Sequence, residues 1–298
     1  MEKVLILGAT GNIGALAADR LVRENVSLRL VSSRESGVKS LRERFPSAEV
    51  LQADWYDPAS LKAAMRGVDR LFIVTPDFVT DETVVTPNII DAVREAGSVS
   101  QIVRLTAMPP GLKATDISRE VLATRCGAAQ HMVAKPLLDA SGLPITYLNV
   151  ACWIMFNMSW YLAEPVKTQQ QLLMPAVTDA RRRWVSEEDI ADVIARILMD
   201  TPEDHIGQDY LMTGAEQFDY KDVAQLLSDV TGKTITYVDD DSMLKTSMGG
   251  CFDTLMTYYT HESRDYLSVP ASDAKLKILG VRQTTLAEYL TQNITMFI

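Results

Sequence analysis

The sequence lacks the features that mark membrane, disulfide-stabilised and nucleic-acid-binding proteins. None of its apolar runs approaches the ~18 residues that a membrane-spanning helix requires. The three cysteines, Cys126, Cys152 and Cys251, are widely spaced and form no Cys-x-x-Cys pair. They therefore predict neither a disulfide framework nor a zinc site. Acidic residues outnumber basic ones by 39 to 29, and the net charge of −10 opposes binding to nucleic acid or to anionic membranes.

The first apolar run begins at Val4, which leaves no room ahead of it for a secretory signal. We therefore expect a cytoplasmic protein whose ligand is a small molecule. Residues 239–241 are three aspartates without a nearby histidine or glutamate, so they predict a strand end and a helix N-cap but no metal site. With 298 residues, 47% of them hydrophobic, the chain can bury a large core.

The first two dozen residues contain a strand, a glycine-rich turn and a helix in immediate succession. Residues 4–7 are apolar, residues 8–14 read Gly-Ala-Thr-Gly-Asn-Ile-Gly, and a helical pattern follows. In a dinucleotide site, Gly8 would allow the tight turn, Gly11 would admit a pyrophosphate to the backbone, and Gly14 would let helix and strand pack closely. The alternative is a tight turn in another kind of α/β protein. The expected cofactor-binding residues of this turn are Gly8, Thr10, Gly11, Asn12 and Ile13.

Short apolar runs alternate with helical patterns over the first half of the chain. Strands are expected at residues 4–7, 27–32, 49–53, 70–74, 101–105 and 145–150, and helices at 59–65, 81–96 and 118–140. This alternation predicts right-handed crossovers and a doubly wound parallel sheet, a Rossmann α/β fold, in residues 1–150. Residues 151–298 are expected to form a smaller, mostly helical substrate-binding region packed on the cofactor domain.

The end of the second strand indicates which nicotinamide cofactor is used. A carboxylate there would hold the ribose 2′-OH of NAD, whereas arginine suits the 2′-phosphate of NADP. The chain has Ser33 and Arg34 at this point, with Lys39 as a second cation. Because arginine binds phosphate through charge-assisted hydrogen bonds, Ser33 and Arg34 favour NADP (NADPH). The neighbouring Glu35 keeps the NAD alternative open, with Arg34 as an ordinary loop charge.

Three other strand ends place residues beside the cofactor by topology. Asp54 follows the third strand and is expected to accept a hydrogen bond from the adenine; the alternative is a loop aspartate without a partner. Thr75 and Pro76 follow the fourth strand, where the ribose and phosphates should pass. Thr106 ends the fifth, beside the expected nicotinamide.

Taken together, these residues resemble a known family. The glycine turn, Arg34, Asp54, Thr75-Pro76 and the segment 131–147 are similar to those of the atypical short-chain dehydrogenase/reductases. The similarity is greatest to the NmrA-like branch, whose relatives include quinone, triphenylmethane and isoflavone reductases. The resemblance covers most of the chain and implies either an NADP-dependent reductase or a cofactor-binding sensor.

The sequence departs from the superfamily in its acid–base residues. The usual acid is the tyrosine of Tyr-x-x-x-Lys, and no tyrosine here has a lysine four residues on. His131 stands where that tyrosine, or the acid–base lysine of the isoflavone-reductase relatives, would be expected. The resemblance therefore implies that His131 is the catalytic proton donor and that Lys135, one turn later, is catalytic and binds the nicotinamide ribose. The alternatives are a structural histidine and a solvated lysine.

Residues 153–161 form a dense aromatic and methionine segment. Such side chains typically line apolar ligand pockets, so Trp153, Met155 and Phe156 are expected to bind the substrate. The same segment would also suit ordinary core or the contact of a homodimer.

The pattern favours an enzyme that transfers hydride from NADPH to a flat, mostly apolar molecule such as a quinone, an enone or an imine. The alternative is a non-catalytic NADP-binding redox sensor of the NmrA type. A serine hydrolase is a poor third, because the chain contains no Gly-x-Ser-x-Gly motif.

Overall fold

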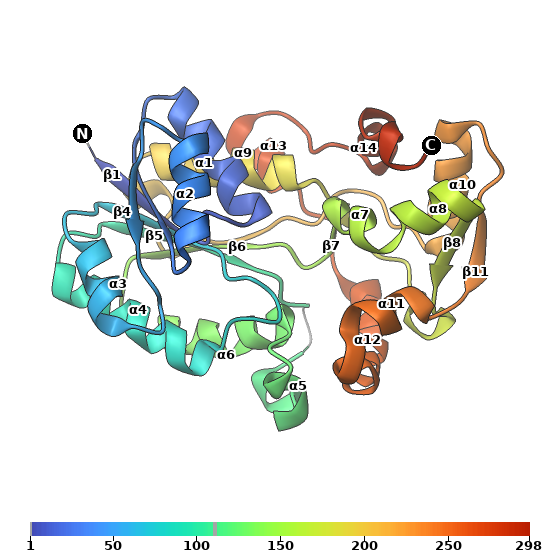
Figure 1. Ribbon diagram of the computed structural model, residues 1–298, viewed down its shortest axis with the longest axis horizontal. Coiled ribbons are helices and arrows are strands. Elements are labelled where there is room, and N and C mark those ends of the chain that lie inside the picture. The colour runs from blue at the N-terminus through green and yellow to red at the C-terminus, as the bar shows by residue number, and fades with distance from the viewer. Residues whose placement is uncertain (1, 110–111) are drawn as a thin grey trace.

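A seven-stranded, fully parallel sheet forms the larger half of the molecule (Figure 1). The computed structural model describes residues 2–109 and 112–298. The strands lie in the order β10-β6-β5-β4-β1-β2-β3. From β1 the chain first adds β2 and β3 on one side and then β4, β5 and β6 on the other, which confirms the doubly wound Rossmann fold. Their bounds are β1 Lys3–Leu7, β2 Ser27–Ser32, β3 Glu49–Gln52, β4 Arg70–Ile73, β5 Gln101–Thr106, β6 Ile145–Asn149 and β10 Asp209–Leu211.

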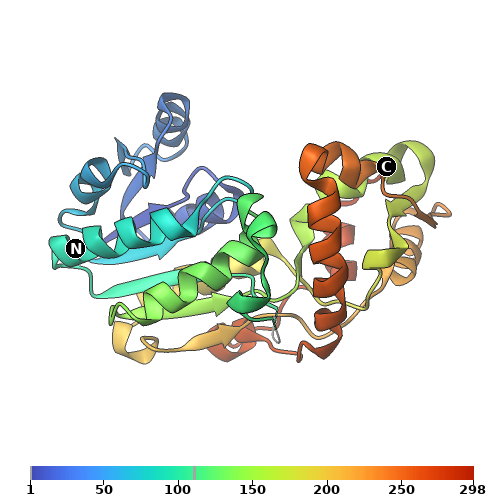
Figure 2. The same cartoon turned by 90° about the horizontal axis from the view of Figure 1, so that it is seen from below.

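The strands are apolar because helices cover both faces of the sheet (Figures 1 and 2). In β1, Val4 and Ile6 face one layer, while Leu5 and Leu7 face the other. The first layer consists of α1 (Asn12–Arg23), α2 (Glu35–Arg44), α9 (Glu187–Met199) and α13 (Ala274–Leu279). The second consists of α3 (Pro58–Met65), α4 (Glu82–Ala96) and α6 (Gly127–Asp139).

The boundary expected at residue 150 does not separate the two halves of the molecule, because later segments return to the first sheet. Strand β10 adds to the sheet beside β6, although it lies in the second half of the chain. Helix α9 packs on α1, where Arg20 Nε bonds Asp192 Oδ1 at 3.0 Å. The apolar face of α1 requires a partner, and the chain supplies it only after residue 186.

The smaller half is mostly helical, as expected, with a core of its own. Its two short parallel pairs are β8 (Gln171–Met174) with β11 (Thr236–Asp239) and β7 (Trp153–Ile154) with β9 (Trp184–Val185). Around them lie α7 (Met158–Tyr161), α8 (Ala163–Gln169), α10 (Tyr220–Thr231), α11 (Ser242–Met248) and α14 (Leu286–Gln292). Helix α12 (Phe252–Asp265) joins the two halves by packing on α5 (Arg119–Ala123). Among the described residues, no helix has the length and apolar character of a membrane span.

The expected single helix over residues 118–140 is wrong, because α5 and α6 are separate helices. The chain turns between them at Arg125, whose φ of +58° is incompatible with a continuing right-handed helix. Thr124 stabilises the break, since its hydroxyl donates to Val121 O at 2.6 Å. Phe78 N also donates to Arg125 O at 2.9 Å, so the break docks on the loop after β4.

Side chains fix several helix starts. Asp57 accepts the N–H of Ala59 at the start of α3, and Ser186 accepts that of Glu188 at the start of α9. Asp189, three residues after Ser186, bonds Lys275 Nζ at 2.6 Å and the hydroxyl of Thr284 at 3.0 Å. These partners come from the C-terminal segment, which sequence periodicity does not place there.

Glu262 in α12 supplies a test of the packing between the two halves. Burial raises the pKa of its carboxyl from 4.5 to about 7, although Tyr258 Oη donates to it at 3.1 Å. A raised carboxyl pKa stabilises the fold at low pH, and that stabilisation is lost as the pH rises through about 7. Between about pH 5 and pH 8, Glu262→Gln should gain about 2 kcal/mol of unfolding free energy relative to wild type. Denaturant titrations at both pH values measure this, with the exposed Glu216→Gln as control. A constant difference would contradict the assignment.

Candidate cofactor and hydride-transfer site

The glycine turn between β1 and α1 forms a cradle that other residues cannot build. Gly8 has φ of +98°, and a Cβ on it would lie 2.0 Å from Val74 O. A Cβ on Gly14 would lie 2.2 Å from Gly8 O. A Cβ on Gly11 would lie 3.3 Å from Gly8 O, a tight contact but less severe than the other two, and the Gly11 N–H donates to Gly8 O at 3.0 Å. Gly8 and Gly14 therefore set the close approach of β1, β4 and α1 at the point where the strand order reverses.

The start of α1 is suited to an anion. Its N-cap, Gly11, contributes no side-chain hydrogen bond, and the first turn of the helix has no acidic residue. The helix dipole and the free N–H groups therefore favour a phosphate there. Thr10 and Asn12 are exposed beside this helix end, as expected of cofactor contacts. The side chain of Ile13 is buried in the core, so it could contribute only its backbone.

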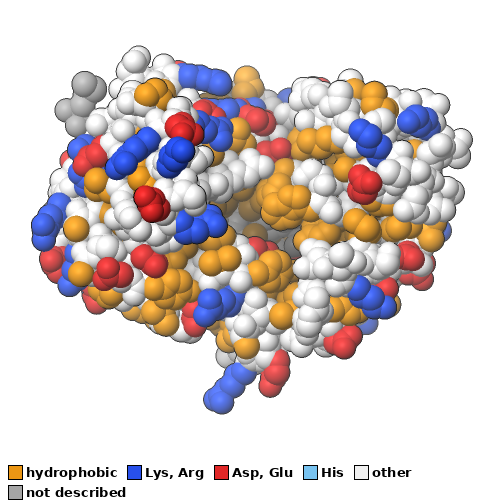
Figure 3. Space-filling view, viewed as in Figure 1, with side chains coloured by type: hydrophobic (Ala, Val, Ile, Leu, Met, Phe, Trp, Pro, Cys, Tyr) orange, Lys and Arg blue, Asp and Glu red, His pale blue; other side chains and the backbone are white. Residues whose placement is uncertain are grey.

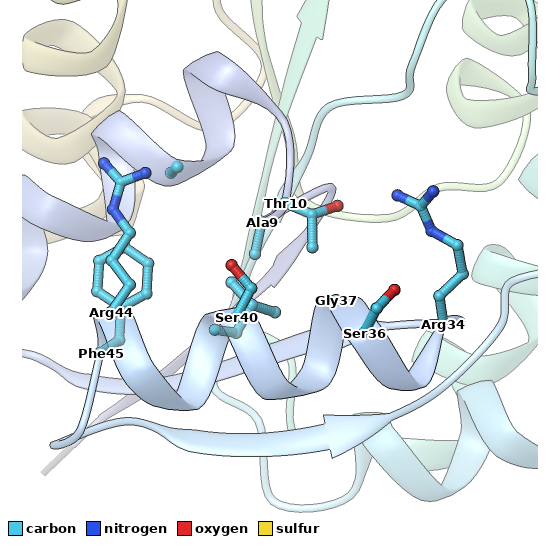
Figure 4. A pocket seen from close by; sticks show the side chains of 10 residues that line it. Ala9, Thr10, Arg34, Ser36, Gly37, Ser40, Arg44 and Phe45 are labelled. Carbon is cyan, nitrogen blue, oxygen red and sulfur yellow. The ribbon is translucent and has the colours of Figure 1, made fainter.

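A cavity of about 280 Å³ adjoins the cradle and extends along α2 (Figure 4). Arg34, Ser36 and Ser40 point from the start of α2 toward the turn that carries Thr10. Helix α2 lies close to β2, because a Cβ on Gly37 would be 2.2 Å from Ser32 Oγ. A guanidinium and three hydroxyls thus face one space, a set of donors that suits a phosphate.

The cations around this cavity differ in their availability. The Arg34 side chain is exposed and makes no hydrogen bond or ion pair within the described chain. Arg44 also lines the cavity, but it pairs with Asp19 at 2.6 Å. Lys39, expected as a second cation, lies outside the lining residues and faces Glu43 at 3.9 Å. Arg34 is therefore the cation best placed for an added anion.

The residues expected to contact the cofactor after β2, β3 and β4 lie at the carboxyl edge of the sheet. Ser33 is exposed, with its carbonyl accepting from Gln52 Nε2 at 3.0 Å. Asp54 is half-buried and accepts the N–H of Tyr56 at 2.9 Å, so it has a local partner in its own turn. Thr75 is half-buried beside the exposed Pro76.

His131, in α6, places its ring beside the end of β5 and acts there as a hydrogen-bond acceptor. Its Nδ1 accepts the backbone N–H of Ala107 at 2.9 Å, so the proton of the neutral ring is on Nε2. Burial and the nearby Arg104 lower the pKa of His131 to about 3. An imidazolium is therefore not populated at neutral pH. A role for His131 in proton transfer stays a prediction, and only the neutral ring would be available for it.

Thr106 and Lys135 lie in positions that do not match the expectation. The Thr106 side chain is 0% exposed, and its hydroxyl has no hydrogen-bond partner among the described residues. It is inside the sheet, on the face toward α6, and is not presented at the edge. Lys135 bonds Asp139 at 3.1 Å and lies 3.5 Å from Asp209, with Nζ 3.9 Å from the centre of the Tyr147 ring. These contacts hold Lys135 at the β6–β10 side of the sheet, and its nicotinamide and catalytic roles stay predictions.

The aromatic segment is divided between core and surface. Met155 is 1% exposed in the core of the smaller half, so the expected substrate contact is not supported. Trp153 packs against Trp184 at 5.3 Å, with the Arg182 guanidinium over its ring. Phe156 is half-buried, edge-on to Trp160 at 5.0 Å, and Trp160 is 62% exposed. Phe156 remains a candidate for substrate contact, and Trp160 is a second candidate.

Sequence reasoning missed three residues at this edge. Ser36 and Ser40 lie one helical turn apart, a spacing that would have placed both hydroxyls on the face that carries Arg34. Asn149 ends β6, where its Oδ1 accepts from Met108 N at 2.9 Å and its Nδ2 donates to Met108 O at 3.1 Å. An asparagine at the end of a buried parallel strand was the available signal.

The fold and the glycine cradle are those of a Rossmann protein with a dinucleotide-type turn. The model of the NmrA-like family matches residues 1–290. This chain therefore belongs to the NmrA-like family.

Named relatives are similar over nearly their full length. The NAD(P)H azoreductase of Xenophilus azovorans is 26% identical, covering 99% of both chains. Quinone oxidoreductase 2 of Escherichia coli (strain K12) is 26% identical, covering 96% of both. The crystal structure of the Citrobacter sp. triphenylmethane reductase complexed with NADP(H) superposes with a TM-score of 0.77 at 20% identity, covering 97% of this chain and 99% of the other. That likeness supports the fold.

Proposed function

We propose that this protein is an NADPH-dependent reductase that transfers hydride to a flat, mostly apolar small molecule such as a quinone, an enone or an imine. The observation that carries the proposal is the glycine cradle at the start of α1, joined to a cavity where Arg34 has no protein partner within the described chain. This arrangement is the one that a dinucleotide with a 2′-phosphate requires.

The residues present fit the cofactor. The free N–H groups at the start of α1 would hold the pyrophosphate, and Arg34 with Ser36, Ser40 and Thr10 would hold the 2′-phosphate. When bound, NADPH supplies the hydride. Membership of the NmrA-like family agrees with this assignment, and relatives of this chain are named as NAD(P)H azoreductase and quinone oxidoreductase.

The acceptor would bind between the two halves of the molecule. The surface is hollowed there, with hydrophobic side chains gathered around the hollow near α7 (Figure 3). Phe156 and Trp160 belong to the segment 155–161 at this position and offer aromatic surface to a flat molecule. Since His131 is neutral, the product's proton would come from the neutral ring or from water.

Cofactor binding and turnover test the proposal separately. We expect calorimetry to show NADPH binding more tightly than NADH, and NADPH absorbance to fall with at least one member of a panel of quinones, enones, imines, azo dyes and cationic dyes. Binding without consumption of NADPH by any acceptor would favour the sensor. Binding of neither cofactor would refute the nucleotide site.

A further inference from the structure

Arg104 of β5 forms a buried ion pair with Glu82 of α4. Arg104 Nη2 is 2.6 Å from Glu82 Oε1, and the two side chains are 1% and 0% exposed. Arg104 is within β5, opposite Ile73 of β4 and Tyr147 of β6, and Glu82 is in the first turn of α4. The pair is thus enclosed between the sheet and the α4–α6 layer.

Stability alone does not explain such a pair. Removing two charges from water costs several kcal/mol per ion, and well-packed hydrophobic side chains of similar volume often stabilise a protein as well or better. The residues next to Arg104 in β5, Val103 and Leu105, and Ile102 on its own face are apolar and buried. The groups that Arg104 contacts should therefore explain why a charged residue occupies this buried position.

Those groups belong to the hydride-transfer edge. Arg104 Nη2 donates to Thr75 Oγ1 at 3.1 Å, which fixes the residue that follows β4. Glu82 Oε2 accepts from Thr86 Oγ1 at 2.5 Å, and Glu82 N donates to Gln130 Oε1 at 2.8 Å. Gln130 immediately precedes His131, so the pair is linked to the start of α6 as well.

His131 holds the chain that leaves β5. Its Nδ1 accepts the N–H of Ala107, and Asn149 bonds both backbone groups of Met108. A protonated imidazole has no lone pair on Nδ1, so protonation of His131 would break the bond to Ala107. The position of this segment therefore depends on a neutral histidine.

We propose that Arg104 is a positioning residue: it fixes Thr75 and, by offsetting the buried charge of Glu82, lets His131 stay a hydrogen-bond acceptor for Ala107. Burial is the largest cause of the low pKa of His131; of the charged groups, Arg104 from β5 lowers that pKa and Glu82 from α4 raises it. On its own helix, Lys135 is paired with Asp139 and Asp209. That the fixed segment adjoins the nicotinamide rests on the proposed function; the electrostatic role does not.

Titration of the histidine ring by NMR tests the electrostatic role without turnover. The chain has three histidines, and His131→Asn identifies the signal of His131. In wild type and in Arg104→Lys, which keeps the cation, the His131 signal should not titrate above about pH 5. In Arg104→Gln, where only the Glu82 carboxylate remains, its midpoint should rise by about one pH unit or more. Arg104→Gln combined with Glu82→Gln should return it to the wild-type range. An unchanged midpoint in Arg104→Gln would overturn the proposal.

Turnover supplies the second readout. With any acceptor that wild type reduces, Arg104→Gln should lose kcat as the pH falls through the new midpoint, about tenfold per pH unit, while KM for NADPH changes little. Arg104→Lys should restore the wild-type profile. A loss in Arg104→Gln that does not depend on pH would contradict positioning through His131. If wild type reduced no acceptor, the proposed function would be contradicted, but the NMR titration would still test the electrostatic role of Arg104.

Wild type itself provides a test if Arg104→Gln does not fold. The proposal requires a neutral His131 ring and a scalar coupling between Ala107 N and His131 Nδ1 across their hydrogen bond at neutral pH. An imidazolium at neutral pH would overturn it.

Discussion

Replacing Gly8 by alanine is expected to weaken NADPH binding by about 100-fold and to lower the free energy of unfolding by roughly 2–4 kcal/mol. The new Cβ would be 2.0 Å from Val74 O, a backbone atom that is itself fixed because Val74 N donates to Leu7 O at 3.0 Å. The end of β1 must therefore move away from β4, and the start of α1 moves with it. Calorimetry with NADPH and chemical denaturation measure the two effects.

Gly67→Ala is the matched control for that variant. Gly67 also has a left-handed φ, +68°, but a Cβ on it would meet no atom within 4 Å. It carries the cost of the backbone conformation, about 1 kcal/mol, without the clash. NADPH affinity should stay at the wild-type value in Gly67→Ala. A similar loss of NADPH affinity in Gly8→Ala and Gly67→Ala would show that the clash with Val74 O is not the cause of the loss.

Arg34→Ala should weaken NADPH binding by about tenfold to 100-fold and leave NADH nearly unaffected. The guanidinium faces the cavity with Ser36 and Ser40 and has no protein partner within the described chain, so its loss removes a contact specific to the 2′-phosphate. The two dissociation constants, measured at one salt concentration, give the specificity ratio directly.

Lys39→Ala separates that contact from general electrostatics. It removes the same charge from the same helix, but Lys39 does not line the cavity and faces Glu43. We expect the NADPH/NADH ratio to be that of wild type in this variant. Equal losses for both cofactors in Arg34→Ala would remove the 2′-phosphate assignment.

The sequence predicted the sheet well because its signals are local. The strand expected over residues 27–32 matches β2 at both ends, and the strand expected over residues 4–7 lies within β1. Periodicity fails where distant segments compete, as at Arg125, whose left-handed conformation is held by the loop after β4. The docking of α9 and β10 on the nucleotide half likewise depends on tertiary contacts that no local pattern contains.

The same distinction applies to the site. Gly8, Gly11 and Arg34 could be proposed as cofactor contacts from the sequence, because the signal for each lies within one short segment. The state of His131 could not, because it follows from a backbone donor in Ala107 and a guanidinium on β5. Lys135 was assigned by its spacing from His131, but the carboxylates of Asp139 and Asp209 decide where its ammonium lies.

The return of the chain to its first sheet affects how this protein can be synthesised and dissected. The first six strands can emerge from a ribosome in order, but α9 and β10, which cover α1 and extend the sheet beyond β6, follow only after residue 186. A fragment ending at residue 150 would expose the apolar face of α1 and the unpaired edge of β6, a combination that promotes aggregation. We therefore expect a nascent chain to capture the nucleotide only after β10, which ends at Leu211, has been made.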